Sequence, residues 1–239
     1  MEEPEAIVEV LNSHFAADEA ELPAWGKRIL ITAGPTHEKI DPVRFIGNHS
    51  SGRMGIALAD EFARRGAEVS LVLGPSSLKP SERVELIPVT TAEEMLAACQ
   101  ERIGTAHLAI FAAAVADYRP RYSSATKIKH EGEDCLELEL VQNPDIAATL
   151  GAAKEPWQYF MGFALESDAG VEEAKRKMQR KNFDAIVLNS LQDAGAGFAH
   201  PTNKVTLFDR EGAIEAYELK TKEAVAHDIA DFVAKRLET

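Results

Sequence analysis

The sequence predicts an α/β fold in which a mainly parallel sheet is flanked by helices. From Lys27 onward, short apolar stretches rich in β-branched residues alternate with amphipathic stretches of helical length. The chain has 239 residues, of which 45% are hydrophobic, so it is long enough to bury the core of one large domain. Alternation of strands and helices implies right-handed crossovers and therefore parallel strands.

The first half of the chain contains four apolar stretches that predict buried strands: Arg28–Thr32, Val69–Leu73, Val84–Val89 and His107–Ala113. A helix is predicted over Met54–Arg65, and Gly66 ends it. Thr91 and Glu94 have the spacing of a capping box, which predicts a second helix running to about Ile103. Together these elements form the repeated units of a Rossmann-like sheet.

The middle of the chain interrupts this alternation. Val115–Asp134 is polar and rich in turn-forming residues, and Cys135–Val141 alternates with leucines on one side, which predicts a strand. Asn143 is an N-cap type of residue, and Pro144 suits the first position of a helix.

The second half restores the alternation. Four further stretches predict strands: Tyr159–Phe163, Ala185–Leu188, Lys204–Phe208 and Ile214–Leu219. The last two flank Asp209–Gly212, which is typical of a hairpin turn. Helices are predicted over Val171–Lys181 and Thr221–Leu237.

The N-terminal part differs from the rest of the chain. Pro4–Phe15 has the apolar spacing of a short amphipathic helix, and an acidic linker follows it. The expected organisation is therefore an N-terminal helix and linker over residues 1–26 and one domain over residues 27–239.

Composition excludes several classes of protein. The net charge of −13 disfavours nucleic acid and anionic membranes as partners. No apolar stretch approaches the roughly 18 residues of a membrane span, and the N-terminus has no signal-peptide pattern. Cys99 and Cys135 form no zinc-binding or disulfide pattern. We therefore expect a cytoplasmic protein.

Three segments are candidates for a ligand site, because ligands of such sheets bind beyond the carboxyl ends of the strands. The turn Thr32–Thr36 follows the first strand and offers two hydroxyls, although a turn without a ligand is an equal alternative. Ala112–Pro120 follows another strand, and its small residues leave backbone groups accessible. Within it, Asp117 could accept hydrogen bonds, bind a metal ion or simply form a turn.

The segment Asn48–Gly55 precedes the first long helix. The N–H groups at that helix end and the helix dipole favour an anion. Ser50 or Ser51 could instead be an ordinary N-cap. Asn48 is harder to explain as a cap, and its amide could hold or polarise a reacting acyl group.

Basic residues concentrate at two places in this acidic chain. The first is a loop with no acidic residue between its four cations: Arg119, Arg121, Lys127 and Lys129. Such a loop could fold over a polyphosphate, or it could be a solvated surface loop. Lys177 and Lys181 share one face of a predicted helix, where they could bind an anion or complement the helix dipole.

Three classes of function remain open on the residues alone. A nicotinamide-dependent reductase fits poorly, because there is no G-x-G-x-x-G after the first strand and the second strand ends in Leu73-Gly74 without a ribose-binding acid. A nucleoside-triphosphate enzyme fits the basic loop and helix-terminal anion site, although a P-loop motif is absent. A non-catalytic nucleotide sensor would leave Asn48 and Lys127 without a role.

Several motifs together resemble one family: Ile31–Thr36, Asp41–Gly55, Ala113–Tyr118, Lys127–Lys129 and Lys181–Asn182. This order is similar to that of phosphopantothenate–cysteine ligase, in the bacterial form that is usually the C-terminal half of a bifunctional coenzyme A biosynthesis protein. The resemblance extends from Lys27 to the C-terminus. It implies that CTP activates 4′-phosphopantothenate as an acyl-cytidylate, and that the amine of L-cysteine then forms the amide and releases CMP.

The resemblance also implies roles for residues. Asn48 would contact the pantothenate acyl group, Lys127 would neutralise the triphosphate, and Asp117 would line the shared site as a third catalytic residue. Substrate would also contact Ala113 and Ala114. The positions implied for the nucleotide are Phe111, Ala112, Ala113, Asp117, Lys127, Pro144, Asp145, Ile146, Ala147, Phe163, Lys177 and Lys181.

Finally, the resemblance implies partners. Arg44 is similar to a residue that reaches the substrate phosphate of a neighbouring subunit, so a homodimer is expected, formed through a small β extension. Mg²⁺ is expected with the triphosphate, with no protein ligand identified. Glu2–Val8 resembles the linker that follows a decarboxylase domain, which could be fused or lie upstream. One departure is His130, where relatives often have a second lysine in the basic loop.

Overall fold

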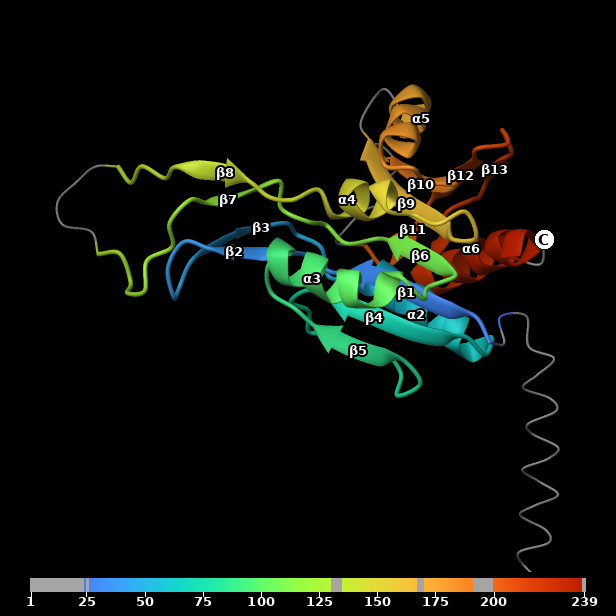
Figure 1. Ribbon diagram of the computed structural model, residues 1–239, viewed down its shortest axis with the longest axis horizontal. Helices are drawn as coiled ribbons and strands as arrows, with labels where there is room; N and C mark the ends of the chain where they lie inside the picture. Colours follow the sequence, from blue (N-terminus) through green and yellow to red (C-terminus); the bar gives the residue numbers. More distant parts are fainter. Residues whose placement is uncertain (1–23, 25, 130–134, 167–169, 191–199, 238–239) are drawn as a thin grey trace, which may run out of the picture.

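An eight-stranded sheet forms the centre of the computed structural model, which describes residues 24, 26–129, 135–166, 170–190 and 200–237. Its strands are β1 (Arg28–Ala33), β4 (Glu68–Leu73), β5 (Glu85–Pro88), β6 (Leu108–Phe111), β9 (Tyr159–Glu166), β10 (Ala185–Ser190), β12 (Val205–Asp209) and β13 (Ile214–Ala216). Their order is β13-β12-β10-β9-β6-β1-β4-β5 (Figure 1). Neighbours from β5 to β10 are parallel, and β12 and β13 are antiparallel. The predicted α/β, Rossmann-like, mainly parallel sheet is therefore confirmed.

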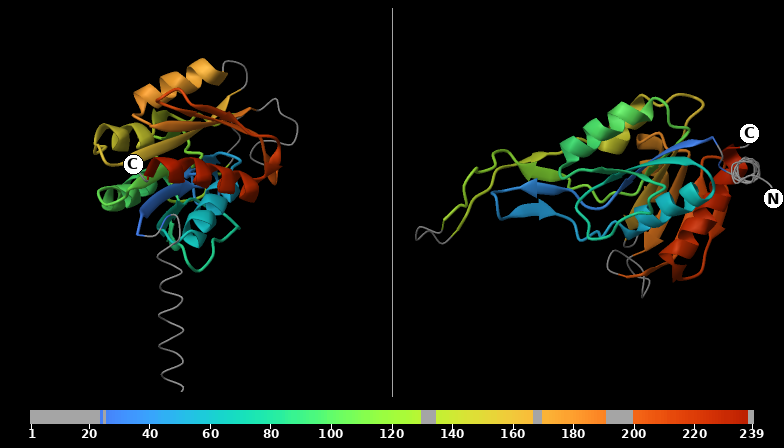
Figure 2. Two further views of the ribbon diagram at one scale, coloured as in Figure 1. Left: turned by 90° about the vertical axis from the view of Figure 1, so that its right-hand side faces the viewer. Right: turned by 90° about the horizontal axis from the view of Figure 1, so that it is seen from below.

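Helices cover both faces of this sheet (Figure 2). On one face lie α2 (Arg53–Arg64) and α6 (Lys222–Leu237), and on the other lie α3 (Ala92–Ile103), α4 (Ile146–Ala152) and α5 (Gly170–Arg180). The core divides in the same way. Ile31 packs with Phe62 and Phe232 in one cluster, whereas its neighbour Leu30 packs with Met95 in the other. Successive residues of a strand point to opposite faces, so β1 contributes to both clusters.

Two hairpins project from the carboxyl edge of the sheet as an arm (Figures 1 and 2). Its strands are β2 (His37–Lys39), β3 (Phe45–Gly47), β7 (Tyr118–Pro120) and β8 (Leu140–Gln142). We use "the arm" for residues 37–47, 118–129 and 135–142. The buried carboxylate of Asp41 joins the two hairpins, since it accepts hydrogen bonds from Arg44 Nη2 at 2.6 Å and from the N–H of Ile128 at 3.2 Å. The arm is the small β extension expected from the sequence.

Most of the predicted elements are confirmed to within a few residues, including the hairpin of β12 and β13. The capping box is also confirmed, because Thr91 Oγ1 accepts from the N–H of Glu94 and the Glu94 carboxylate accepts from the N–H of Thr91. The predicted helix Pro4–Phe15 and its linker lie outside the described residues. Among the described residues, no helix is both long and apolar enough to cross a membrane.

The predicted strand Cys135–Val141 is largely wrong. Only Leu140–Gln142 forms a strand, and it pairs with β7 of the arm. The alternating Leu136 and Leu138 are exposed. The alternating pattern resembles that of a strand packed on the core, whereas these leucines lie on the projecting arm and are exposed.

The predicted start of α4 is also wrong. Its N-cap is Asp145, whose carboxylate accepts from the N–H of Ala148 at 3.1 Å. Asn143 is buried two residues earlier, and its Nδ2 donates to the carbonyl of Ala116 at 2.8 Å. Pro144 therefore precedes the cap. The tertiary contact to Ala116 determined the role of Asn143, which local propensity could not show.

We expect Thr91→Ala to lower the free energy of unfolding by about 1 kcal/mol, because it removes the hydrogen-bond acceptor that caps α3. Urea denaturation followed by circular dichroism measures this change. Thr91→Ser retains the acceptor and serves as the control. Equal stability of the alanine variant and the wild type would contradict the importance of the capping box.

Candidate functional site

A cleft of about 580 Å³ lies beyond the carboxyl ends of β1, β6 and β9. Most of the residues singled out from the sequence line it: Asn48, Phe111, Ala112, Ala113, Ala114, Asp117, Pro144, Asp145, Ile146, Ala147, Phe163, Lys177 and Lys181. Residues from distant parts of the chain therefore converge where an open α/β sheet binds its ligands.

Of the turn Thr32–Thr36 after β1, only Thr32 lines the cleft, and the rest of the turn supports it from below. Gly34 has a φ of 78°, and a Cβ there would lie 3.1 Å from the carbonyl oxygen of Gly74, so glycine suits this position. The hydroxyl of Thr32 accepts from the N–H of Ala113 at 3.4 Å, and that of Thr36 accepts from the N–H of Ala116 at 3.0 Å. The hydroxyls of Thr32 and Thr36, which the sequence made candidates for contact with a ligand, thus hold Ala113 and Ala116 of the segment after β6 in place.

The N-terminus of α2 forms one wall. Its N-cap is Gly52, which is in the left-handed conformation with no side-chain capping bond, so the prediction of Ser50 or Ser51 as the N-cap is wrong. Their hydroxyls accept only from the N–H groups of Gly52 and Arg53, at 3.3 and 3.5 Å. Gly55 lets the helix approach β1, because a Cβ there would lie 2.4 Å from Ala33 Cβ. This helix end favours an anion in the cleft.

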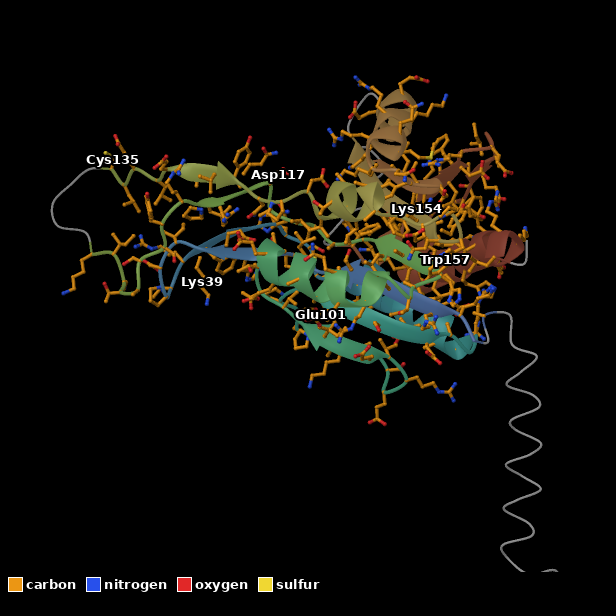
Figure 3. All side chains as sticks on the ribbon, viewed as in Figure 1. Lys39, Glu101, Asp117, Cys135, Lys154 and Trp157 are labelled. Atoms are coloured by element: carbon orange, nitrogen blue, oxygen red, sulfur yellow. The ribbon has the colours of Figure 1, made fainter. Side chains whose placement is uncertain are left out.

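Asn48 is held in place by the segment that follows β6. Its Nδ2 donates to the carbonyls of Ala114 at 2.9 Å and Val115 at 3.2 Å. These bonds orient the amide and leave its oxygen for another partner. Asp117 lies where the arm joins the body of the protein (Figure 3), and its carbonyl accepts from the N–H of Asn143 at 2.8 Å.

The opposite wall comes from α4 and α5. Lys181 Nζ lies 2.8 Å from the carboxylate of Asp145, and Lys177 and Arg180 also line the cleft. Burial alone would raise the pKa of Asp145. The hydrogen bond from Lys181 outweighs this effect of burial, together with the N–H of Ala148 and the charges of Lys181 and Arg180. The pKa of Asp145 is therefore lowered. The result is a wall with surplus positive charge.

The aromatic floor beside this wall depends on a close approach. Phe111 stacks on Phe183 with ring centroids 5.5 Å apart. A Cβ on Gly162 would lie 2.0 Å from the Phe183 ring, so any larger residue would displace that ring. Phe163, the next residue, is partly buried and lines the cleft.

The arm holds two of the expected site residues away from the cleft of their own chain. Lys127 is exposed, and Arg44 binds Asp41 and donates to the carbonyl of Ile128 at 3.0 Å. The hydrogen bonds from Arg44 hold the pKa of the Asp41 carboxyl well below its usual range. The geometry thus fixes the backbone next to Lys127, while the roles expected for Lys127 and Arg44 stay predictions.

Two cations of the expected basic loop already have acidic partners. Arg119 lies 2.8 Å from Glu93, and Arg121 lies 2.6 Å from Glu139. The prediction of four cations available to a polyphosphate is therefore wrong for these two, because the loop folds beside acidic residues from α3 and from the segment before β8.

Sequence reasoning missed several polar residues that line the cleft: Gln142, Asn143, Arg180, Asn189, Asn203 and Lys222. Asn189 carries a signal that could have identified it, because it follows an apolar strand at its carboxyl end, as Thr32 does. Asn203 and Lys222 carry no such signal, because they lie outside the strand-end segments.

The fold and the cleft define a Rossmann-like α/β protein with a cleft at the carboxyl edge of its parallel sheet. The family model of the DNA/pantothenate metabolism flavoprotein C-terminal domain matches residues 24–237, and the chain belongs to this family. The resemblance drawn from the motifs is thus confirmed at the level of the family.

Relatives support this assignment. The chain is 51% identical over 231 residues to a protein named cysteine/cysteine sulfinic acid decarboxylase from an unknown prokaryotic organism. The alignment covers 96% of this chain and 64% of that protein. It is 42% identical to the coenzyme A biosynthesis bifunctional protein CoaBC of Vibrio cholerae, covering 89% of the chain and 53% of the relative. The chain therefore spans roughly half to two thirds of the length of these relatives.

A solved structure has the same fold. The crystal structure of the C-terminal domain of a coenzyme A biosynthesis bifunctional protein CoaBC is 40% identical, with a TM-score of 0.78. The match covers 91% of this chain and 99% of that domain.

Proposed function

We propose that this chain joins 4′-phosphopantothenate to L-cysteine at the expense of CTP and forms 4′-phosphopantothenoylcysteine, a step of coenzyme A biosynthesis. One observation carries the proposal: the anion-binding end of α2, the oriented amide of Asn48 and the basic wall of α5 line one cleft. A carboxylate does not react with an amine in water, so a nucleotide must first supply a leaving group.

In the first step, a carboxylate oxygen of phosphopantothenate attacks the α-phosphorus of CTP. The new O–P bond forms as the bond from that phosphorus to the bridging oxygen breaks, and pyrophosphate leaves with the electron pair. Negative charge grows on the leaving group. The N-terminus of α2 lies where it can stabilise this charge, and Lys127 is assigned the same task.

In the second step, the unprotonated amine of cysteine attacks the acyl carbon. A C–N bond forms, the acyl C–O bond to the nucleotide breaks, and CMP leaves with the electron pair while the amine loses a proton to solvent. Charge develops on the acyl oxygen in the tetrahedral intermediate. Asn48, whose amide oxygen can hold an N–H or O–H of the pantothenate chain, lies at the place assigned to this carbon, and Ala113 and Ala114 contribute the adjoining backbone.

Mg²⁺ is proposed to enter the cleft with the triphosphate. The described residues contain no cluster of three His, Cys, Asp or Glu side chains that could hold a metal ion. Phosphate oxygens and water are usual Mg²⁺ ligands, and only one or two carboxylates are needed besides them. Of the two carboxylates that line the cleft, Asp145 is paired with Lys181, so Asp117 is the candidate ligand.

We propose that the arm binds a second copy of this chain. Large apolar side chains are exposed along it: Val43, Phe45, Tyr118, Tyr122, Leu136, Leu138 and Leu140. An apolar surface of this kind is typical of a protein interface. Dimerisation through the arm would bring Arg44 and Lys127 toward a neighbouring subunit, in keeping with their position outside the cleft of their own chain.

Leu140→Asp is expected to weaken the dimer at least about tenfold, because it places a charge at a buried interface. Sedimentation velocity over a range of protein concentrations measures the dissociation constant. Leu219→Asp is a matched control, because both leucines are 45% exposed and Leu219 lies outside the arm. Equal dimerisation of the two variants would place the interface elsewhere.

A decarboxylase partner is also proposed. The relatives named as bifunctional are longer than this chain, which matches only part of them. The product of the ligation carries the carboxylate of cysteine, so the reaction that consumes it can be a decarboxylation. That activity would lie in a fused domain or a separate protein.

Release of pyrophosphate tests the proposal. The chain is incubated with phosphopantothenate, Mg²⁺ and either CTP or ATP, with and without cysteine, and CMP and the amide product are measured by mass spectrometry. We expect CTP to be preferred and the amide to require cysteine. Absence of pyrophosphate with every nucleotide would overturn the proposal.

Two other activities are checked in parallel. Oxidation of a reduced nicotinamide with a carbonyl substrate would support a reductase instead. Release of CO₂ from cysteine without a nucleotide would support the activity named for the 51% identical relative. Either result, without amide formation, would replace the ligase assignment.

A further inference from the structure

One end of the cleft has polar groups to which the nucleotide and pantothenate assignments give no task. Four residues from four elements line it: Arg53 from α2, Asn189 from β10, Asn203 from β11 (Thr202–Asn203) and Lys222 from α6. Asn189 pairs with Val205, two residues after Asn203, and the charge of Arg53 acts on Lys222. β11 pairs with β14 (Lys220–Thr221), which leads directly into α6, so this small ribbon brings Asn203 next to the start of that helix.

Two amide oxygens at this end lack a hydrogen bond. Within the part of the chain that the structure describes, three buried side-chain polar atoms have no partner, and two of them are Oδ1 of Asn189 and Oδ1 of Asn203. Asn203 is only 1% exposed. A buried oxygen without a donor is destabilising, so both oxygens favour a ligand that donates hydrogen bonds.

Two cations of this end lie close enough to act on each other. Lys222 is 4% exposed and begins α6, and Arg53 begins α2. Burial, and then the charge of Arg53, lower the pKa of Lys222. Among the described residues, Glu223 is an acidic neighbour; it is exposed and lies 4.0 Å from Arg53. A carboxylate bound here would relieve the repulsion between the two cations.

We propose that this end of the cleft is the subsite for the amino-acid substrate. Its carboxylate binds between Lys222 and Arg53, and its amino group donates to the oxygens of Asn189 and Asn203. The assignment rests on the ligase function proposed above and locates its second substrate.

A zwitterion fits this subsite better than the end of a triphosphate does. A fully ionised phosphate accepts hydrogen bonds but donates none, so it would leave the two amide oxygens unsatisfied. The amino group of cysteine supplies the donors, and its carboxylate supplies the negative charge. The two amide oxygens and the two cations then both have a partner on the ligand.

The subsite also favours the reactive form of the amine. Positive charges nearby disfavour the ammonium ion relative to the free amine. The amide oxygens can hold N–H groups of the free amine while its lone pair remains available for the acyl carbon. Lys222, Asn189 and Asn203 are therefore binding and positioning residues for the second step.

The test compares L-cysteine with cysteamine, which lacks the carboxylate. Loss of one charge-assisted contact costs about 1.5–3 kcal/mol, so Lys222→Met should lower the kcat/KM ratio of cysteine to cysteamine by about 10- to 100-fold. The ratio is measured within one variant, so partial misfolding, which reduces both activities alike, does not change it. Lys220→Met is the matched control, because Lys220 lies two residues before Lys222 and its Nζ binds the carboxylate of Asp228 in α6 at 2.7 Å.

Asn203→Ser provides a second, independent variant. We expect it to raise the KM for cysteine about tenfold, while the exchange of labelled pyrophosphate into CTP, which needs no cysteine, slows less than about twofold. A fall in exchange as large as the rise in KM would assign this end to the triphosphate and overturn the proposal. An unchanged cysteine-to-cysteamine ratio in Lys222→Met would also overturn it. A wild-type chain without any exchange would refute the ligase function itself.

Discussion

Asn48→Ala is expected to slow amide formation by about 10²-fold, because the oxygen of its amide can hold an N–H or O–H of the pantothenate chain and so position the acyl carbon for attack. Asn48 is oriented by the carbonyls of Ala114 and Val115, so its amide is held in position before substrate binds. Rapid-quench measurement of cysteine reacting with preformed acyl-cytidylate isolates this step. The affinity for CTP should change little.

His49→Ala is the control for Asn48→Ala. His49 is the adjacent exposed residue and is absent from the lining of the cleft. Its replacement should leave the second step within about twofold of the wild-type rate, as for surface changes away from a site. If Asn48→Ala instead weakened CTP binding and left amide formation intact, Asn48 would belong to the nucleotide site.

Lys127→Ala is expected to slow activation of phosphopantothenate by about 10²-fold or more, because a cation that neutralises the triphosphate acts most strongly as the leaving group gains charge. The KM for cysteine should change far less. Exchange of pyrophosphate into CTP measures activation, and the complete reaction measures the KM. Equal loss in both would argue against the role assigned to Lys127.

Lys39→Ala is the matched control, because Lys39 is another exposed lysine of the arm (Figure 3). A mixed dimer gives a further test of which subunit Lys127 serves. If the arm reaches the neighbouring cleft, mixing the inactive Asn48→Ala and Lys127→Ala proteins creates one site with both residues intact, and activity returns. If Lys127 serves its own chain, the mixture stays inactive.

The order and type of the elements could be predicted from the sequence because they depend on local patterns. The apolar β1, the helical spacing of α2 and the capping box at Thr91 are set by residues within a few positions of one another. The predictions were wrong where a distant contact outweighed local propensity. Asn143 binds Ala116 and does not cap α4, and Gly52 occupies the N-cap of α2 in place of a serine.

The residues of the candidate site also fall into those that the sequence predicts and those that only the tertiary contacts bring in. Most of its residues follow the carboxyl ends of strands, so a parallel sheet necessarily brings them to one edge, and the motifs around Asn48 indicated their family. Asn203 and Lys222 enter the cleft because the β11–β14 ribbon packs against α6, which in turn contacts α2.

By itself, the sequence determined the mainly parallel α/β fold, the family and the main walls of the cleft, because periodicity and strand ends are properties of neighbouring residues. Only the tertiary structure decided that Lys127 and Arg44 lie on an arm outside their own cleft. It also revealed two unpartnered amide oxygens beside two cations. These features arise from contacts between segments far apart in the chain, and no local pattern encodes them.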